Sequence, residues 1–212
     1  MTDYEAWVEH PEYRWMFDRL ALAERLGYKC GPHGVWPDEF PVISKPIINL
    51  YGMGIGAEVF ENDDAFPYRA GHFWCELFEG EWRSYDIDLT SDYCYEAIVV
   101  DSEDRYCPTV WEITQQRTPG WLWPQVLPGL KKKPNRMNVE TIGQRVIEMH
   151  PRWTEEFEPY YDGRPFTCEV MWWPSIDDPP LEGFTDTRLC DSNVLRLAEG
   201  KAARIGIRIA RC

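Results

Sequence analysis

Short strand-like segments, separated by glycine and proline, dominate the chain after Phe40. The segments PVISKPI, HFWCELF, EWRSYDIDL, YEAIVVD, TVWEIT, RVIEM and FTCEVMWW are rich in β-branched and aromatic residues, a composition typical of strands. The stretch from Glu12 to Gly27 has an apolar stripe at helical spacing, and Gly27 suits a helix end. Because strands predominate, in two groups with the turn Glu79-Gly80 between or beside them, the pattern predicts an α+β fold with antiparallel sheets.

Three other stretches predict irregular structure. The four prolines between Pro119 and Pro134 indicate a loop or an irregular lid. Residues 174–193 are expected to be mostly loop. The segment 195–210, LRLAEGKAARIGIRIA, fits either a hairpin or a helix followed by a strand.

The size and charge of the chain narrow its class. Its 212 residues suffice for one large domain or for two small lobes that share a cleft. A hydrophobic share of 44% favours a packed core over disorder. The net charge of −14 disfavours general binding to nucleic acid or to an anionic membrane, but suits a cleft that holds Mg²⁺. The one basic run, Lys131–Lys133, is either a solvated loop or a local patch for a polyanion.

Cysteine and aromatic usage add two expectations. The seven cysteines are odd in number and form no CxxC pair, so we expect reduced, mostly buried thiols in a cytoplasmic protein. The sequence shows no signal-peptide pattern and no apolar run long enough to span a membrane. Eleven tryptophans indicate either a core stiffened by large rings or stacking on a ring-bearing ligand.

Lys45 lies in the middle of the apolar segment PVISKPI, close to a glycine-rich stretch. A lysine in an apolar strand is costly unless its ammonium meets an anion. Gly52, Gly54 and Gly56 could let backbone N–H groups crowd around phosphates. The pattern therefore predicts a phosphate clamp. The alternative is an edge lysine whose ammonium reaches water.

The block Glu76-Leu77-Phe78 precedes the Glu79-Gly80 turn. An extended hinge at this point would expose backbone groups to an adenine edge, and Leu77 and Phe78 could pack on the ring. The alternative is an ordinary β-hairpin.

Acidic side chains recur at alternate positions in NVETIGQRVIEMHPRW. On strands, Asn138 and Glu140 share one face, as do Glu148 and His150. Two carboxylates from adjacent strands can hold Mg²⁺, which prefers oxygen ligands. Arg152 continues the same face if the strand persists, and could bind a phosphate or carboxylate. The alternative is a surface cluster of ion pairs.

The order of these segments resembles the ATP-grasp superfamily from about Met16 to Arg152. The segment PVISKP is similar to the strand that supplies an ATP-binding lysine, CELFEG looks like the adenine hinge, and VIEMHPR looks like the metal-binding strand. The pattern is most similar to small stand-alone ATP-grasp proteins of the kind that phages encode. The resemblance implies two lobes, residues 1–75 and 76–212, that enclose a nucleotide cleft.

The resemblance also implies a function, an ATP- and Mg²⁺-dependent ligase that joins a carboxylate to an amine or a thiol through an acyl-phosphate. Lys45 and Arg14 would neutralise the α- and β-phosphates. Glu140 and Glu148 would hold Mg²⁺. The glycine hairpin would close over the triphosphate and exclude water.

The same resemblance implies which residues bind the substrate. Arg152 and Arg83 would bind the substrate carboxylate or the acyl-phosphate. The carboxylate and its acceptor are unidentified, and the acceptor could be as large as a protein or a nucleic acid.

Several positions depart from the ATP-grasp pattern. His150, a candidate metal ligand beside Glu140 and Glu148, stands where the family has asparagine. Because histidine ligates Mg²⁺ poorly, His150 would contact phosphate or favour a different metal. Trp82 stands where a ribose-binding carboxylate is expected, with Glu81 one position early. Arg14 replaces a lysine. The pattern begins close to Met1, so a separate N-terminal substrate domain is not expected. These departures favour an alternative, a nucleotide-binding module without turnover. The net charge motivates another, an acidic interaction protein that mimics nucleic acid.

Overall fold

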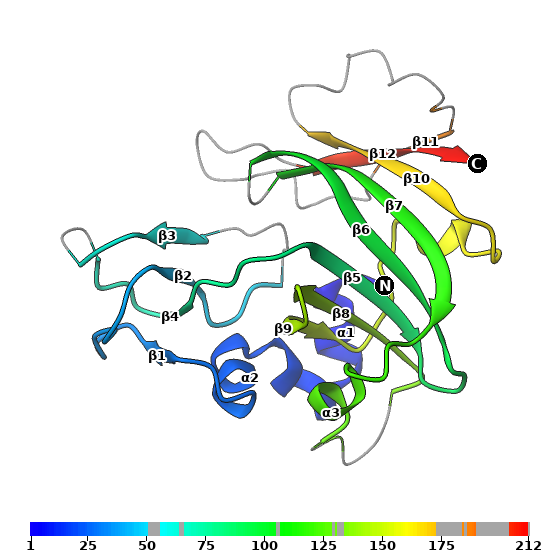
Figure 1. The fold of residues 1–212 in the computed structure, drawn as a ribbon. Helices are drawn as coiled ribbons and strands as arrows, with labels where there is room; N and C mark the ends of the chain where they lie inside the picture. The colour runs from blue at the N-terminus through cyan, green and yellow to red at the C-terminus, as the bar shows by residue number, and fades with distance from the viewer. Residues whose placement is uncertain are drawn as a thin grey trace.

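The computed structural model shows two antiparallel sheets, and most of its helical residues belong to the N-terminal part of the chain (Figure 1). It describes residues 1–50, 56–63, 66–104, 107–128, 130, 134–172, 184, 186–189 and 204–211. The α+β class with antiparallel sheets, predicted from the strand patterns, is confirmed.

The N-terminal region is a chain of short helices. They are α1 (Asp3–Glu9), the 3₁₀ helix η1 (Pro11–Phe17) and α2 (Arg19–Arg25). The single helix expected from Glu12 to Gly27 is wrong, because Asp18 has an extended backbone and its carboxylate accepts a hydrogen bond from the Ala21 N–H. An aspartate in this role begins a new helix. Gly27 does follow the end of α2, with a φ of +74°.

Helix α1 was missed, although its start follows a known pattern. The Thr2 hydroxyl accepts a hydrogen bond from the Glu5 N–H at 3.2 Å, and the Glu5 carboxylate accepts one from the Thr2 N–H at 2.7 Å. This reciprocal pair is a capping box, which the T-x-x-E spacing indicates. The helix matters below because its first residue is Asp3.

The smaller sheet has the strand order β1-β4-β2-β3. Its strands are β1 (Cys30–Pro32), β2 (Val42–Pro46), β3 (Glu58–Phe60) and β4 (His72–Glu76). The strand predicted from PVISKPI is thus confirmed as β2, and Lys45 lies opposite Phe73 of β4. Buried Ala23 of α2 packs with Phe73 and Cys75 of β4, so the helix covers one face of this sheet.

The larger sheet has the strand order β11-β12-β10-β7-β6-β5-β8-β9. Its members are β5 (Trp82–Asp88), β6 (Tyr93–Asp104), β7 (Cys107–Arg117), β8 (Arg136–Ile142), β9 (Arg145–His150), β10 (Phe166–Trp172), β11 (Asp186–Leu189) and β12 (Arg204–Arg211). A further short 3₁₀ helix, η2 (Glu158–Tyr160), precedes β10. Strand β11, which pairs with β12, lies within the stretch 174–193 that is expected to be mostly loop; apart from β11 and residue 184, this stretch lies outside the described residues.

The proline-rich stretch after β7 is not a lid in its described part. It contains α3 (Trp123–Val126), and Leu122 and Val126 are fully buried in the core that includes Tyr85. Burial of these apolar side chains holds the segment against the larger sheet. Lys131–Lys133 lie outside the described residues.

The two sheets are joined by residues 77–81, because β4 belongs to one sheet and β5 to the other. The alternative of an ordinary β-hairpin at this point is therefore wrong. Helix α2 packs against β1 of the smaller sheet and against β9 of the larger one. The proposed lobes, residues 1–75 and 76–212, stay a prediction, although the change of sheet falls near their boundary.

Four of the cysteines fit the expectation of free thiols. Cys30 is partly buried, whereas Cys75, Cys94 and Cys168 are buried, and all four are free. In the described part of the chain, no helix has both the length and the apolar character needed to cross a membrane.

Candidate functional site

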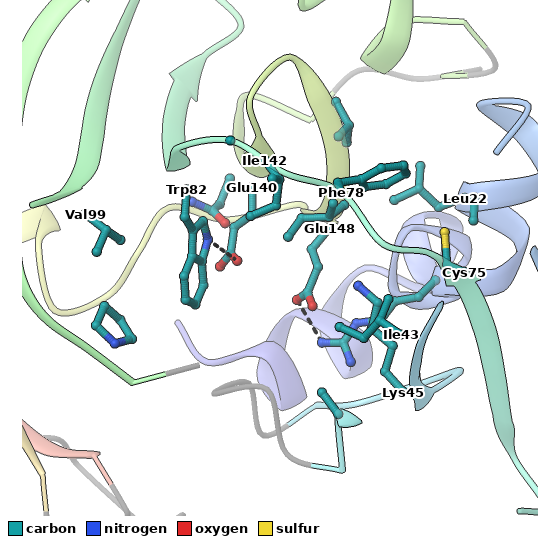
Figure 2. A pocket seen from close by; sticks show the side chains of 18 of the residues that line it. Leu22, Ile43, Lys45, Cys75, Phe78, Trp82, Val99, Glu140, Ile142 and Glu148 are labelled. Atoms are coloured by element: carbon teal, nitrogen blue, oxygen red, sulfur yellow. Dashed lines mark hydrogen bonds and ion pairs between the residues drawn. The ribbon is translucent and has the colours of Figure 1, made fainter. Parts of the chain in front are cut away.

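A cavity of about 590 Å³ lies where the two sheets, the linker 77–81 and helix α2 meet. Figure 2 shows the carboxylates of Glu140 and Glu148 pointing into it, between Trp82 on one side and Lys45 on the other. The predicted phosphate, hinge and metal segments therefore converge on one space.

Strand pairing brings the carboxylates together. Glu140 of β8 lies directly opposite Glu148 of β9, and Asn138 lies opposite His150. A register shift follows Glu140, so that Ile147 is an extra residue on β9; such bulges redirect neighbouring side chains. One ligand atom from each of Glu140, Glu148 and His150 lies within 4.8 Å of the others.

Glu148 is held by a buried arginine that the sequence did not single out. The Arg19 guanidinium donates to Glu148 Oε2 at 2.7 Å, and the two side chains are 4% and 14% exposed. Burial alone would raise the pKa of Glu148, but Arg19 and His150 together hold that pKa below its usual value. Glu148 is therefore an anion within the cavity.

The surroundings of Glu140 shift its pKa in the direction opposite to that of Glu148. Burial, and then the neighbouring charge of Glu148, raise its pKa above the usual value for a glutamate. The Trp82 indole N–H donates to Glu140 Oε2 at 3.2 Å. Two carboxylates that repel each other in a buried space are stabilised by a shared cation. This pair is thus suited to a divalent metal ion.

Lys45 contributes a positive charge on the opposite wall. Burial lowers the pKa of Lys45, and the nearby Glu148 partly offsets that effect. Among the described residues, its ammonium has neither a hydrogen-bond partner nor an ion-pair partner. A partly buried cation of this kind is stabilised when an anionic ligand enters.

Of the three predicted glycines, Gly52 and Gly54 lie outside the described residues. Gly56 has a φ of +76°, and a Cβ there would lie 3.0 Å from the Pro46 side chain. Only glycine lets the chain pass so close to β2. Gly56 therefore borders the lysine strand.

The linker forms the apolar wall of the cavity. Leu77 and Phe78 line it, and Figure 2 shows Phe78 on the same side as Leu22 and Ile43. The Phe78 ring contacts Tyr28 edge-on, with centroids 4.8 Å apart. Packing of this kind provides a flat, apolar surface for a ring.

Gly80 of the linker makes a close backbone contact. It has a φ of +136°, and a Cβ there would lie 3.0 Å from the Gly143 nitrogen.

Gly80→Ala is therefore expected to lower the free energy of unfolding by about 1–3 kcal/mol, measured by chemical denaturation. The control is Gly120→Ala, because no atom lies within 4 Å of a Cβ at Gly120, and it should change stability by less than about 0.5 kcal/mol. Equal effects of the two changes would contradict this account of Gly80.

Asp3, His150 and Arg152 form a group of ion pairs beside the carboxylates of Glu140 and Glu148. Asp3 Oδ1 lies 2.9 Å from His150 Nδ1 and 2.6 Å from Arg152 Nη2. Burial would raise the pKa of Asp3, but His150 and Arg152 hold it well below its usual range. Burial would lower the pKa of His150, yet Asp3 and Glu148 raise it to about 9. Arg152 reaches this cluster although β9 ends at His150, before the proline.

Two of the predicted arginines lie outside the cavity lining. Arg14 is exposed, donates to the Trp7 carbonyl at 2.8 Å and does not line the cavity. Arg83 pairs with Glu96 and Glu81 and does not line it either. The alternation of β5 places Arg83 one position after Trp82, on the other face. Neither arginine is retained as a ligand of phosphate or substrate.

Glu76 lines the cavity, but its carboxylate is also used locally. Its Oε1 accepts a hydrogen bond from the Lys29 N–H at 2.9 Å, and the Glu76 N–H donates to the Lys29 carbonyl at 2.8 Å. These bonds fix the start of the linker against β1.

Comparison with known proteins identifies the fold. The sequence matches no protein-family model and no curated protein. Solved structures do resemble the chain. With N5-carboxyaminoimidazole synthetase from Staphylococcus aureus, the TM-score is 0.58 at 12% identity, over 93% of this chain and 68% of that chain. With L-amino acid ligase from Bacillus licheniformis it is 0.56 at 9% identity, over 91% and 65%.

An ATP-grasp superfamily protein from Archaeoglobus fulgidus gives a TM-score of 0.52 at 14% identity, over 93% of this chain and 64% of that chain. The chain therefore has the ATP-grasp fold, as the order of its motifs predicted. It spans about two thirds of the length of these structures.

Proposed function

We propose that this chain binds ATP and Mg²⁺ in the cavity and uses them to activate a carboxylate for ligation to an amine or a thiol. The observation that carries the proposal is the placement of Lys45 opposite the partly buried carboxylates of Glu140 and Glu148. Within the described part of the chain, the Lys45 ammonium has no hydrogen-bond or ion-pair partner, although the charge of Glu148 lies near enough to act on its pKa. Polyphosphate fits between them, because its oxygens can bind the ammonium on one side and a shared metal ion on the other.

The apolar wall supports the nucleotide part of the proposal. Leu22, Ile43 and Phe78 would contact the adenine ring, and the backbone of residues 77–81 would offer hydrogen bonds to its edge. One structural neighbour, the synthetase from Staphylococcus aureus, is a complex with ADP, and another is an L-amino acid ligase. These neighbours favour a nucleotide in a cavity of this fold.

The donor set fits Mg²⁺. Glu140 and Glu148 provide oxygen ligands from paired positions, and Mg²⁺ usually takes one or two carboxylates together with phosphate oxygens and water. When bound, the ion would neutralise charge on the phosphates and hold them in line for transfer. The residues of this chain would position the reactants and exclude water.

The proposed reaction has two steps. A carboxylate oxygen attacks the γ-phosphorus of ATP, so that an O–P bond forms and the bond to ADP breaks. The nucleophile then attacks the acyl carbon, releases inorganic phosphate and loses its proton to solvent. Lys45 would stabilise the phosphates, and Arg152 would hold the substrate carboxylate or acyl-phosphate at the other end of the cavity.

A second candidate function is nucleotide binding without turnover. The observation that favours it is the engagement of Arg152 by Asp3, whose carboxylate accepts from Arg152 Nε at 2.7 Å. An arginine already paired with an internal carboxylate is less available to a substrate.

Product analysis separates these functions. Pure protein is incubated with Mg-ATP, amino acids and other small carboxylates, and amine or thiol acceptors. The ligase is expected to release ADP and phosphate only when a suitable carboxylate is present, and Glu148→Gln should remove that release. Release of AMP and pyrophosphate would contradict the acyl-phosphate route. Binding of Mg-ATP with no nucleotide product would support the second candidate.

A further inference from the structure

His150 gives the carboxylate pair a nitrogen neighbour. Its side chain is buried, and its Nε2 lies 3.5 Å from Glu148 Oε2. The other ring nitrogen, Nδ1, lies 2.9 Å from Asp3 Oδ1. The ring thus stands between an outer carboxylate and the pair that faces the cavity. A carboxylate beside the outer nitrogen can orient a metal-binding imidazole. Asp3 Oδ1 is within reach of Nδ1 for this role, without an aligned hydrogen bond between the two atoms.

The neighbouring amide has other hydrogen-bond partners. Asn138, which faces His150 across the strand pair, donates its amide hydrogens to Ser84 Oγ and to Asp86 Oδ1, both at 2.7 Å. The adjacent arginines, Arg19 and Arg152, have no lone pair to offer. Among the described side chains of this cluster, His150 therefore supplies the nitrogen with a lone pair for a metal ion, and it does so within 4.8 Å of the ligand oxygens of Glu140 and Glu148.

We infer that Glu140, Glu148 and His150 form a mixed nitrogen and oxygen site that selects a first-row transition divalent cation such as Mn²⁺ over Mg²⁺, with Asp3 as the residue that positions the imidazole. This rests on the metal site of the proposed function and deepens it. Mg²⁺ is a hard ion that favours oxygen, whereas imidazole suits the transition metals. Because metal ligands must be deprotonated, binding would displace the imidazole proton.

The first test uses MnCl₂ alone, without nucleotide, so that the only nitrogen ligands come from the protein. Pulsed electron paramagnetic resonance is expected to show ¹⁴N coupling to the bound Mn²⁺. Calorimetric titration should show Mn²⁺ binding at least about tenfold tighter than Mg²⁺. Absence of Mn²⁺ binding, or binding without ¹⁴N coupling, would overturn the inference.

Two variants test whether His150 is the source of the ¹⁴N coupling. His150→Gln should lose the ¹⁴N coupling and reduce the preference for Mn²⁺ by roughly tenfold, because it replaces the nitrogen ligand with an oxygen. The matched control is His72→Gln, since His72 lies on β4 and is not among the cavity residues; it should change neither property. If His150→Gln does not fold, the ¹⁴N coupling of the native protein still decides the assignment of nitrogen.

Asp3→Asn tests the positioning role. It should weaken Mn²⁺ binding by about tenfold and leave Mg²⁺ binding nearly unchanged. A merely structural role would weaken both ions equally. Failure of this inference is distinct from failure of the proposed function: if ATP binds with either metal and ¹⁴N coupling is absent, only the inference fails. If ATP does not bind with either metal, the proposed function fails.

Discussion

Replacement of Arg19 by methionine is expected to lower the free energy of unfolding by about 3–5 kcal/mol. The change leaves the buried carboxylate of Glu148 without its arginine partner, and loss of one member of a buried ion pair typically has an effect of this size. A small domain has a total stability of only about 5–15 kcal/mol, so the loss is large. Chemical denaturation measures it.

Two further variants make the test specific. Arg14→Met is the matched control, because Arg14 is an exposed arginine of the same helical region and contacts the Trp7 ring and carbonyl. It should change stability by less than about 1 kcal/mol. The double variant Arg19→Met/Glu148→Leu should be less destabilised than Arg19→Met, because no buried charge is left unpaired. Equal losses in Arg19→Met and Arg14→Met would contradict the buried-pair account.

Replacement of Lys45 by methionine is expected to weaken Mg-ATP binding by about 10- to 100-fold, the value of one hydrogen bond to a charged group. The free protein should be nearly as stable as the native chain, because methionine fills a similar volume and removes a cation that burial disfavours. Isothermal calorimetry measures the affinity, and thermal unfolding measures the stability.

The control for Lys45→Met is the same replacement at another lysine close to the smaller sheet. Lys29 is exposed and pairs with Glu39 at 2.5 Å. Lys29→Met should leave Mg-ATP affinity within about twofold of the native value, since surface ion pairs contribute little. If both lysine variants bind Mg-ATP as tightly as the native chain, Lys45 is not a phosphate ligand.

Local patterns in the sequence predicted much of the fold. Several site residues lie in short segments whose pattern of apolar and polar residues can be recognised locally. They are Lys45 on its strand, the linker that starts at Leu77, and the carboxylates of Glu140 and Glu148. Alternation along a strand decides which side chains share a face. The order of those segments along the chain was enough to indicate the ATP-grasp fold.

Two residues that complete the site, Arg19 and Asp3, were not predicted, because their roles depend on contacts distant in sequence. Arg19 and Glu148 are 129 positions apart, and Asp3 and Arg152 are 149 apart. Nothing in the local pattern of the helical region distinguishes Arg19 from Arg14. The difference is that Arg19 follows the helix break at Asp18, which turns α2 toward β9. The capping box at Thr2 could have located α1, but not its contact with His150.

The most direct test is a crystal structure of the protein with Mg²⁺ and a non-hydrolysable ATP analogue. The proposed function predicts a triphosphate between the Lys45 ammonium and the Glu148 carboxylate, with the adenine ring against Phe78. A nucleotide bound elsewhere on the chain, or one in the cavity that contacts neither Lys45 nor Glu148, would contradict it.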